Sequence, residues 1–205
     1  MSQTSLFNSP RLAYRAVRPV GDLPVFVAIN ADQLGYQNSN FSNNKLPSQS
    51  DAEKFLKATM EESLLGAVIW HPYDANLAQD VRQRLIEKAK QDGEIVEDWG
   101  TAIGEIHLSA LDKYSAHHRW TEIGLDILPA YQGKGYGGEA IAWALDYAFR
   151  RAGMHRVRIR AFKWNEGAIR LYEKLGFKLE GRERESLWHE GRWWDSVTLG
   201  LLEGE

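Results

Sequence analysis

The stretch Gln132-Gly133-Lys134-Gly135-Tyr136-Gly137-Gly138 decides how the rest of this sequence is interpreted. Before it, 119–128 has the pattern of a strand closed by Pro129, and apolar residues from 140 to 149 follow at helical spacing. Glycines let backbone N–H groups approach a ligand closely, and a helix N-terminus adds about half a positive charge. The stretch therefore predicts a pyrophosphate cradle, with a plain turn as the alternative.

Downstream of this stretch the order of elements is clear. A strand is expected over 156–162, and Asn165 is placed to cap a helix that runs through Leu175 and stops at Gly176. Two further strands, 178–188 and 193–202, are expected to form a hairpin around Glu190-Gly191. These elements predict a core made of a mixed sheet with helices packed on it, and the cradle joins one strand of this sheet to a helix.

The upstream half is predicted from shorter signals. A strand is expected over 11–17, then a short helix capped by Asp22 with Pro24 in its first turn, a polar loop over 31–49, and a helix opened by a capping box of Ser50 and Glu53. Strands at 64–70 and 101–111 would form a hairpin interrupted by an amphipathic helix at 76–91. Its apolar stripe is Leu77, Val81, Leu85 and Ala89.

Composition limits the class of protein. The chain has 205 residues, 43% of them hydrophobic and 26% charged, which is typical of one globular domain with an insertion. A net charge of -3 offers no general attraction for nucleic acid, and the longest apolar run, 64–70, is too short to cross a membrane. The chain has no cysteine, so a thiol nucleophile and a disulfide framework are excluded, and the cytoplasm is the default location.

Two motifs together resemble a known family. Gln132-x-x-Gly135-x-Gly137 after a strand, followed by Asn165-x-x-Ala168-x-x-Leu171-Tyr172-Glu173-x-x-Gly176-Phe177, is similar to the GNAT superfamily of acyl-CoA-dependent N-acetyltransferases. The ending, with Glu180-Gly181 and then 188–202, most resembles the Rim-type branch that includes ribosomal-protein N-terminal acetyltransferases. That branch also resembles enzymes acting on antibiotics, amino acids and polyamines.

The resemblance implies a fold and a reaction. The fold would be α/β: a mixed, mostly antiparallel sheet with helices on both faces, forming a single domain over 1–205 with a helical insertion at 73–99 between strands 2 and 3. Acetyl-CoA would bind between two splayed strands and transfer its acetyl group directly to a primary amine in a ternary complex. No metal and no nucleic-acid or membrane partner is implied, and the protein would be a monomer or homodimer.

The same resemblance assigns site residues. The backbone of Gln132, Gly133, Lys134, Gly135, Tyr136, Gly137 and Gly138 would hold the pyrophosphate, and that of Ile127 and Leu128 would pair with the pantetheine arm and polarise the thioester. Asn165 would contact the same arm or serve only as a helix cap. One or two arginines among Arg150, Arg151, Arg156, Arg158 and Arg160 would meet the adenosine 3′-phosphate.

Two residues are candidates for proton transfer. Tyr172 matches the tyrosine that protonates the departing thiolate, against the alternative of a core tyrosine. Glu122 is the candidate base, against the alternative of an exposed strand glutamate. Asp126 would share the face of Glu122 but is set aside, because a second negative charge near the CoA phosphates would be unfavourable.

Other features remain open. His107, His117 and His118 are expected at the surface rather than around a metal, and Trp188, Trp193 and Trp194 are expected to pack on the sheet rather than cover an acceptor. The segment 73–99 is expected to govern acceptor choice without binding CoA, with a decorative flap or dimer contact as the alternative. The rival function is a non-catalytic CoA-binding or interaction module, and a peptide N-terminus competes with a small-molecule amine as acceptor.

Overall fold

The computed structural model describes residues 6–42 and 46–205. The strands are β1 (Ala13–Ala16), β2 (Ser63–Pro72), β3 (Val96–Glu97), β4 (Gly100–Ser109), β5 (Trp120–Ile127), β6 (Arg156–Phe162), β7 (Lys178–His189) and β8 (Arg192–Leu202). The helices are α1 (Leu23–Ala31), α2 (Gln33–Ser39), α3 (Gln49–Glu61), α4 (Gln79–Gln91), α5 (Tyr136–Asp146) and α6 (Glu166–Lys174). Short 3₁₀ turns lie at Ala116–His118 and Pro129–Tyr131, and α5 continues as a π turn, Tyr147–Arg151.

These strands form one sheet in the order β1-β2-β4-β5-β6-β8-β7, with β3 paired to β4 beside this path. Every neighbouring pair is antiparallel except β5 with β6, which pair in parallel over three residues, Trp120–Glu122 with Arg156–Arg158. Beyond those three residues β5 and β6 separate. The expected α/β fold, mostly antiparallel and with helices on both faces, is confirmed.

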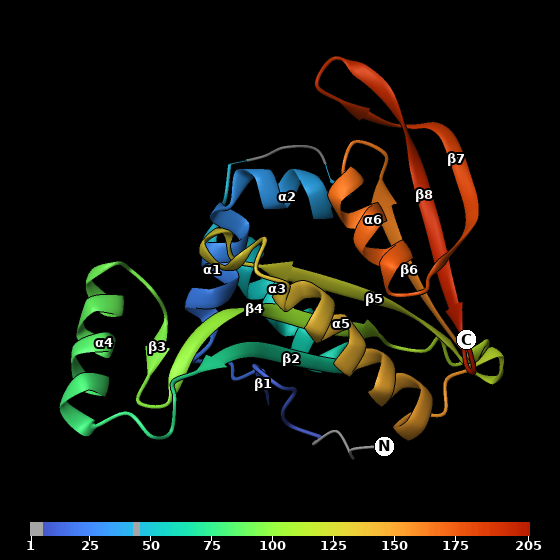
Figure 1. Ribbon diagram of the computed structural model, residues 1–205. Helices are drawn as coiled ribbons and strands as arrows, with labels where there is room; N and C mark the ends of the chain where they lie inside the picture. The colour runs from blue at the N-terminus through green and yellow to red at the C-terminus, as the bar shows by residue number, and fades with distance from the viewer. Residues whose placement is uncertain (1–5, 43–45) are drawn as a thin grey trace.

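Helices cover both faces of the sheet (Figure 1). On one face α5 and α6 pack over a large core that includes Ile106, Leu108, Ile141 and Leu199. On the other face α1 and α3 pack over a smaller core around Phe26, Val68 and Trp70. No helix in the described ranges is long and apolar enough to span a membrane.

The region upstream of β2 differs most from expectation. The polar stretch predicted as a loop over 31–49 contains α2, whose residues all remain at least partly exposed. The N-cap of α3 is Ser48, whose hydroxyl accepts from the Asp51 amide, and not Ser50. The Asp22 side chain does not cap α1, because its carboxylate accepts instead from Arg18 and Arg15. Short helices with polar faces lack the periodic apolar signal on which sequence prediction depends.

The insertion between β2 and β4 contains the predicted helix, α4, which begins at residue 79 rather than 76. It also contains the two-residue strand β3, which was not predicted. Its apolar stripe packs only partly, since Val81 and Leu85 remain 39% and 40% exposed while Ile86 and Ala89 are buried. In Figure 1, α4 stands at the margin of the sheet, remote from the β7–β8 hairpin.

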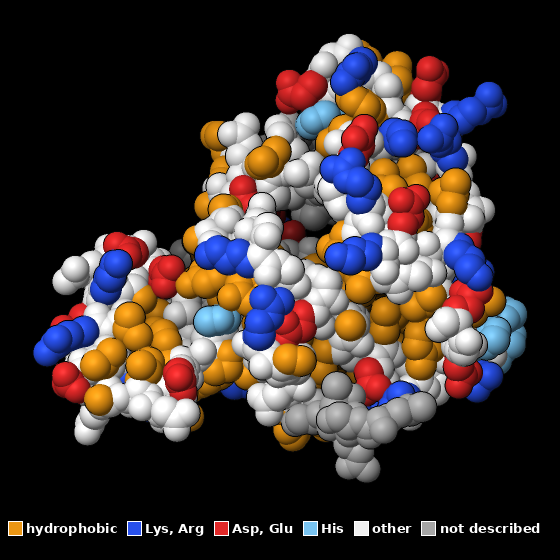
Figure 2. Space-filling model, viewed as in Figure 1, with side chains coloured by type: hydrophobic (Ala, Val, Ile, Leu, Met, Phe, Trp, Pro, Cys, Tyr) orange, Lys and Arg blue, Asp and Glu red, His pale blue; other side chains and the backbone are white. Residues whose placement is uncertain are grey.

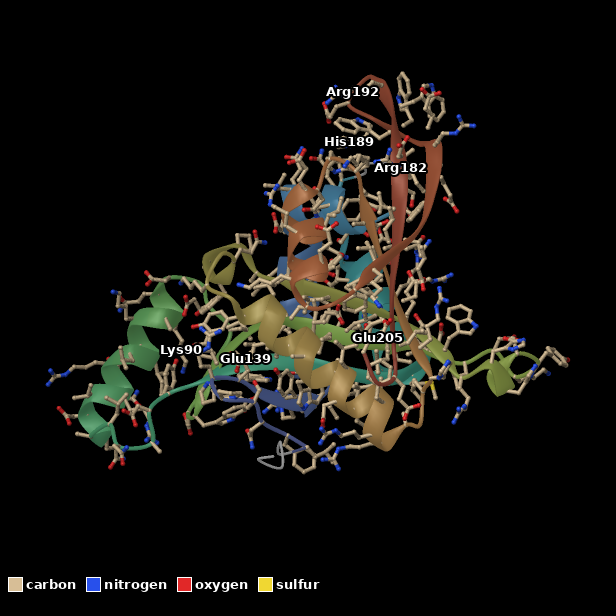
Figure 3. All side chains as sticks on the ribbon, turned by 45° about the vertical axis from the view of Figure 1, so that its right-hand side comes forward. Lys90, Glu139, Arg182, His189, Arg192 and Glu205 are labelled. Atoms are coloured by element: carbon tan, nitrogen blue, oxygen red, sulfur yellow. The ribbon has the colours of Figure 1, made fainter. Side chains whose placement is uncertain are left out.

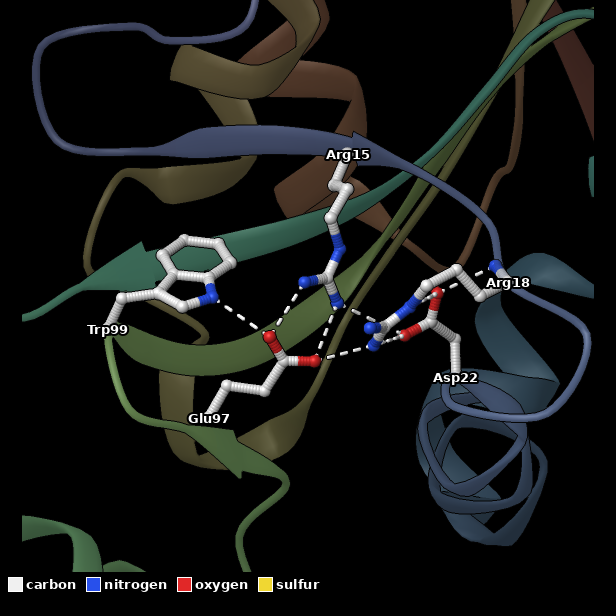
Figure 4. A network of polar contacts seen from close by, with 5 residues as sticks. All are labelled: Arg15, Arg18, Asp22, Glu97 and Trp99. Atoms are coloured by element: carbon white, nitrogen blue, oxygen red, sulfur yellow. Dashed lines mark hydrogen bonds and ion pairs between the residues drawn. The ribbon is translucent and has the colours of Figure 1, made fainter.

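Glu97 ties the end of this insertion to the body of the protein (Figure 4). Its carboxylate accepts hydrogen bonds from Arg15, Arg18 and the Trp99 indole at 2.6–3.1 Å. The Arg15 hydrogen bonds, followed by those of Trp99 and Arg18, outweigh partial burial and lower the pKa of Glu97 to about 2. The same two guanidinium groups reach the buried Asp22, so one network joins β1, α1 and β3.

Candidate active site

A cleft of about 590 Å³ opens where β5 and β6 separate. One wall is β5, the opposite wall is β6 with the start of α6, and the glycine-rich loop and α2 close the two ends. Figure 2 shows this hollow in the middle of the visible face, with acidic atoms in its depth. Its residues include Glu122, Asp126, the loop glycines, Asn165 and Tyr172, so the structure gathers most of the predicted site residues around one cavity.

The glycine-rich loop has the conformation that its glycines predict. Gly133 and Gly135 have φ of 72° and 82°, which favour glycine over residues with a Cβ. Gly135 is the N-cap of α5, so the first amides of that helix face the cleft end without partners inside the helix. These groups are suited to an anionic ligand such as a pyrophosphate.

Arg11 supports this loop from a distant part of the chain. Its backbone N–H and Nε donate to the two carboxylate oxygens of Glu139, each at 2.7 Å, and its Nη1 donates to the Lys134 carbonyl at 3.0 Å. The guanidinium also lies 4.7 Å from the centre of the Tyr136 ring. Figure 3 shows Glu139 at the start of α5. The sequence did not indicate this support, because more than 120 residues separate the partners.

The end of β5 is already engaged in hydrogen bonds. The Leu128 amide donates to the Ile103 carbonyl at 2.8 Å, and the Leu128 carbonyl accepts from the Tyr131 amide at 2.8 Å. The Ile127 carbonyl accepts from Gln132 Nε2 at 2.8 Å. A pantetheine arm could therefore accept from the Leu128 amide only by replacing its bond to Ile103, whereas the Ile127 and Leu128 carbonyls can each accept a second hydrogen bond.

Glu122 lies at the vertex of the cleft, in the last register pair between β5 and β6. Its Oε2 accepts from Arg158 at 2.6 and 3.0 Å, and its Oε1 accepts from Arg160 at 2.5 Å. Accepting a proton would sacrifice these charge-assisted bonds. Two other arginines considered for the adenosine phosphate also have acidic partners, Glu180 for Arg156 and Asp146 for Arg150.

Tyr172 points into the same cavity from α6. Burial, with a smaller contribution from the charge of Asp126, raises the pKa of its hydroxyl to about 12. The hydroxyl therefore stays protonated at neutral pH and can donate a proton. Asn165 lines the cleft as well, and its side-chain oxygen caps α6 by accepting from the Ala168 amide at 3.2 Å, so its structural role is filled.

Asp126 is the functional candidate that the sequence interpretation set aside. β5 is regular, so Asp126 shares a face with Glu122, and it lines both the main cleft and an adjoining cavity of about 290 Å³. Burial, followed by the charge of Glu105, raises the pKa of Asp126 to about 7. The contact with Glu105 could not be found from the sequence, because β4 and β5 are brought into register only by folding.

A third cavity, of about 440 Å³, continues from the cleft past Phe41 and Phe162 to the β7–β8 hairpin. Trp164 lines it and stacks on His189 with ring centres 4.2 Å apart (His189 is labelled in Figure 3). Trp188 and Trp193 are 61% and 56% exposed, so the expectation that they pack on the sheet is wrong. Trp194 does pack, against Trp164.

The insertion lies near the glycine-rich loop. Glu94 hydrogen-bonds Tyr131, which lines the cleft just before the loop, and burial together with this bond raises the pKa of Tyr131. None of the described residues lining the second and third cavities comes from 73–99. The expectation that this segment governs acceptor choice without contributing to CoA binding stays a prediction.

The histidines divide into two groups. His117 and His118 are exposed on a 3₁₀ turn, as expected. His107 instead lies largely inside the protein and hydrogen-bonds Glu105. Among residues 6–42 and 46–205, no three acidic or histidine side chains are grouped in a way that could hold a metal ion.

The parallel strands β5 and β6 part beside a glycine-rich loop and the N-terminus of α5, an arrangement suited to an extended anionic ligand. Residues 11–178 match the acetyltransferase (GNAT) domain, so the chain belongs to the GNAT acetyltransferase family. It is therefore an acyl-CoA-dependent N-acetyltransferase, and the non-catalytic alternative is set aside.

Individual relatives extend this result. The spermidine N(1)-acetyltransferase of Escherichia coli K12 is 29% identical over 133 residues, covering 64% of this chain and 70% of that protein. The putative ribosomal N-acetyltransferase YdaF of Bacillus subtilis is 35% identical over 106 residues, covering 52% and 56%. The crystal structure of spermidine N-acetyltransferase from Vibrio cholerae in complex with CoA and spermine superposes with a TM-score of 0.71 at 24% identity, covering 95% and 97% of the two chains.

Proposed function

We propose that this protein transfers the acetyl group of acetyl-CoA directly to a primary amine of a small cationic molecule, in a ternary complex. The observation that carries this proposal is the single cavity that contains the glycine-rich loop, Tyr172 and Asp126. The cleft offers two chemically different regions, because its glycine-rich loop suits phosphates whereas Glu122 and Asp126 on β5 and Asn38 on α2 line another part of it. The named relative that acts on spermidine supports the cationic acceptor.

Different residues of the cleft would bind acetyl-CoA and transfer protons. The amides from Gln132 to Gly138 would hold the pyrophosphate, and Ile127 with Leu128 and Asn165 would border the pantetheine arm. Bound acetyl-CoA supplies a thioester carbonyl for attack by the amine. Tyr172 would give its proton to the departing sulfur, and Glu122 stays a candidate for the proton acceptor.

A protein N-terminus is the second acceptor class. The resemblance of the C-terminal hairpin to the Rim-type branch and the putative ribosomal acetyltransferase among the relatives favour it. The aromatic third cavity beside the cleft would suit a peptide side chain better than a linear amine.

We place the protein as a monomer or homodimer in the cytoplasm, with no metal and no nucleic-acid partner.

The test is a panel of acceptors with a thiol reagent. Because the chain contains no cysteine, released CoA thiol is measured without protein background. Alkyl diamines, polyamines, amino acids and short peptides are compared by kcat/KM, and acetyl-CoA affinity is measured separately by calorimetry. Turnover with cationic amines supports the proposal, turnover restricted to peptides supports the second acceptor class, and absence of acetyl-CoA binding rejects both.

A further inference from the structure

Asp126 occupies the junction of two cavities. The residues that line both the main cleft and the 290 Å³ cavity are Ser39, Gly124, Leu125 and Asp126, and among these described residues Asp126 alone is ionisable. The main cleft continues from here to Tyr172 and the glycine-rich loop. The smaller cavity continues to α1 and α3. An amine held in the smaller cavity would therefore pass Asp126 before it reached a thioester in the cleft.

A buried pair of ionisable residues stands beside Asp126. Glu105 is opposite Asp126 in the register of β4 with β5, and its side chain is fully buried. His107, two residues along β4 on the same face, places Nδ1 at 3.0 and 3.3 Å from the two carboxylate oxygens of Glu105. Gly124 makes room for this ring, since a Cβ there would come within 2.3 Å of it.

Each neighbour of Asp126 acts on its charge in a known direction. Besides burial, the charges of Glu105 and Asp32 raise its pKa, whereas the neighbouring Ser39 hydroxyl, which also donates to the Gly35 carbonyl, and the charge of His107 lower it. Although burial opposes protonation of His107, the charges of Glu105, Asp126 and Glu122 raise the pKa of its imidazole above the ordinary value. The facing groups, by element, are Glu105 and His107 on β4, Glu122 on β5, Asp32 and Ser39 at the two ends of α2, Asp51 on α3 and Tyr172 on α6.

We propose that Asp126 accepts the proton of the acceptor ammonium group, and that Glu105, which is buried, and His107, which lines the smaller cavity, act as a positioning pair for Asp126 in this step. The inference rests on the proposed acetyl transfer and names its proton acceptor. Glu122 is the alternative acceptor, but both of its oxygens accept from guanidinium groups, whereas Asp126 faces open space in two cavities.

The proposed acetyl transfer conserves atoms and charge. The ammonium R–NH₃⁺ gives one proton to the Asp126 carboxylate, and the freed lone pair of the nitrogen attacks the thioester carbonyl carbon to form the C–N bond. The C–S bond then breaks with its electron pair on sulfur, which takes a proton from Tyr172. The nitrogen loses its second proton, which restores the Tyr172 hydroxyl, and Asp126 releases its proton to water. The products are the amide, CoA thiol and one proton.

The pH dependence of kcat tests this assignment with four variants. In the wild type, kcat for a diamine should rise through an acid limb near pH 7, because burial and the charge of Glu105 raise the pKa of Asp126 to about 7. Asp126→Asn should lower kcat about 10²-fold to 10³-fold and remove the limb. Glu105→Gln removes a charge that raises the pKa of Asp126, so it should move the limb to lower pH; His107→Gln and Ser39→Ala should move it to higher pH.

Opposite shifts from neighbouring positions distinguish positioning from general damage, because a loosened structure lowers kcat without moving the limb in two directions. Ser39 is exposed, so Ser39→Ala keeps the test usable if a buried variant fails to fold. Melting temperature and acetyl-CoA affinity are measured for every variant. The limb should keep its position in Glu122→Gln.

Two results would overturn the inference. One is an Asp126→Asn enzyme with an unchanged limb and a kcat within threefold of the wild type. The other is a limb that disappears in Glu122→Gln and persists in Asp126→Asn, which would assign the proton to Glu122. A wild-type protein that binds acetyl-CoA and acetylates amines but shows either result rejects only the inference, whereas one that does neither rejects the proposed function.

Discussion

Glu122 and Arg158 face each other in the last register pair of β5 and β6, with Arg158 Nη2 2.6 Å from Glu122 Oε2. Arg160, two residues further along β6, donates to the other oxygen at 2.5 Å. One carboxylate on β5 is therefore bound to two cations on β6 at the point where the strands part. These contacts, here called the clamp, join the two strands at the vertex of the cleft.

Glu122→Gln should weaken this vertex. Replacing a half-buried carboxylate that serves two arginines should lower the free energy of unfolding by about 1–3 kcal/mol, as measured by urea denaturation. The matched control is Glu166→Gln, which removes the exposed pair with Arg170 and should change stability by less than about 0.5 kcal/mol. Equal stability of the two variants would show that the clamp does not hold the strands.

Gly135→Val should abolish acetyl-CoA binding while the protein stays folded. Gly135 has φ of 82° at the start of α5, a conformation that a β-branched residue adopts only with strain, and its Cβ would approach the Arg11 guanidinium at 3.3 Å. Gly153→Val is the control, because φ there is 64° and no atom lies within 4 Å. Calorimetry should show lost affinity in the first variant alone; equal affinities would reject the loop as the phosphate site.

Tyr172→Phe should lower kcat about 10²-fold and leave the acetyl-CoA KM nearly unchanged, since the hydroxyl acts as the thiolate departs. Burial raises the pKa of Tyr172 to about 12, so the hydroxyl is protonated at neutral pH, as the proposed role requires. Tyr147→Phe serves as the control, because Tyr147 packs on the same core without lining the cleft. Steady-state kinetics decide between the two roles, and wild-type turnover in Tyr172→Phe would leave only a packing role.

Glu97→Gln should destabilise the protein in a pH-dependent way. The pKa of Glu97 is lowered from 4.5 to about 2 on folding, so its ion pairs contribute stability above pH 4.5 that is lost as the pH falls towards 2. The variant should be about 1–3 kcal/mol less stable than the wild type at pH 7, and this difference should shrink between pH 4.5 and 2. Urea denaturation at several pH values measures it. A difference that does not vary with pH would contradict the ion-pair explanation.

Glu94→Gln should raise the KM for acetyl-CoA by about fivefold or less, because it weakens one hydrogen bond to Tyr131 beside the glycine-rich loop. The order of preference among amine acceptors should stay the same, since no described residue of the insertion lines the second cavity, of about 290 Å³, or the third, of about 440 Å³. Glu87→Gln, on the exposed face of α4, provides the control. A changed acceptor order in Glu94→Gln would restore the role first inferred for the insertion.

The sequence by itself determined the fold class and the location of the glycine-rich loop that opens α5. Gly133 and Gly135 adopt positive φ as their residue type predicts, the strand Arg156–Phe162 has the predicted bounds, and Asn165 caps α6. These features depend on local chemistry, in which a residue and its neighbours within one turn or strand decide the outcome.

Only the tertiary structure decided which side chains share the cleft. Glu122 was identified from the sequence as a candidate base, but its partners Arg158 and Arg160 come from another strand. The charges that act on Asp126 come from Glu105 and His107 on the neighbouring strand β4. The helix α2, which was missed, brings Ser39 against Asp126. Interactions between charges depend on their distance and burial. Strand register and helix packing set both quantities, and neither follows from the local sequence pattern.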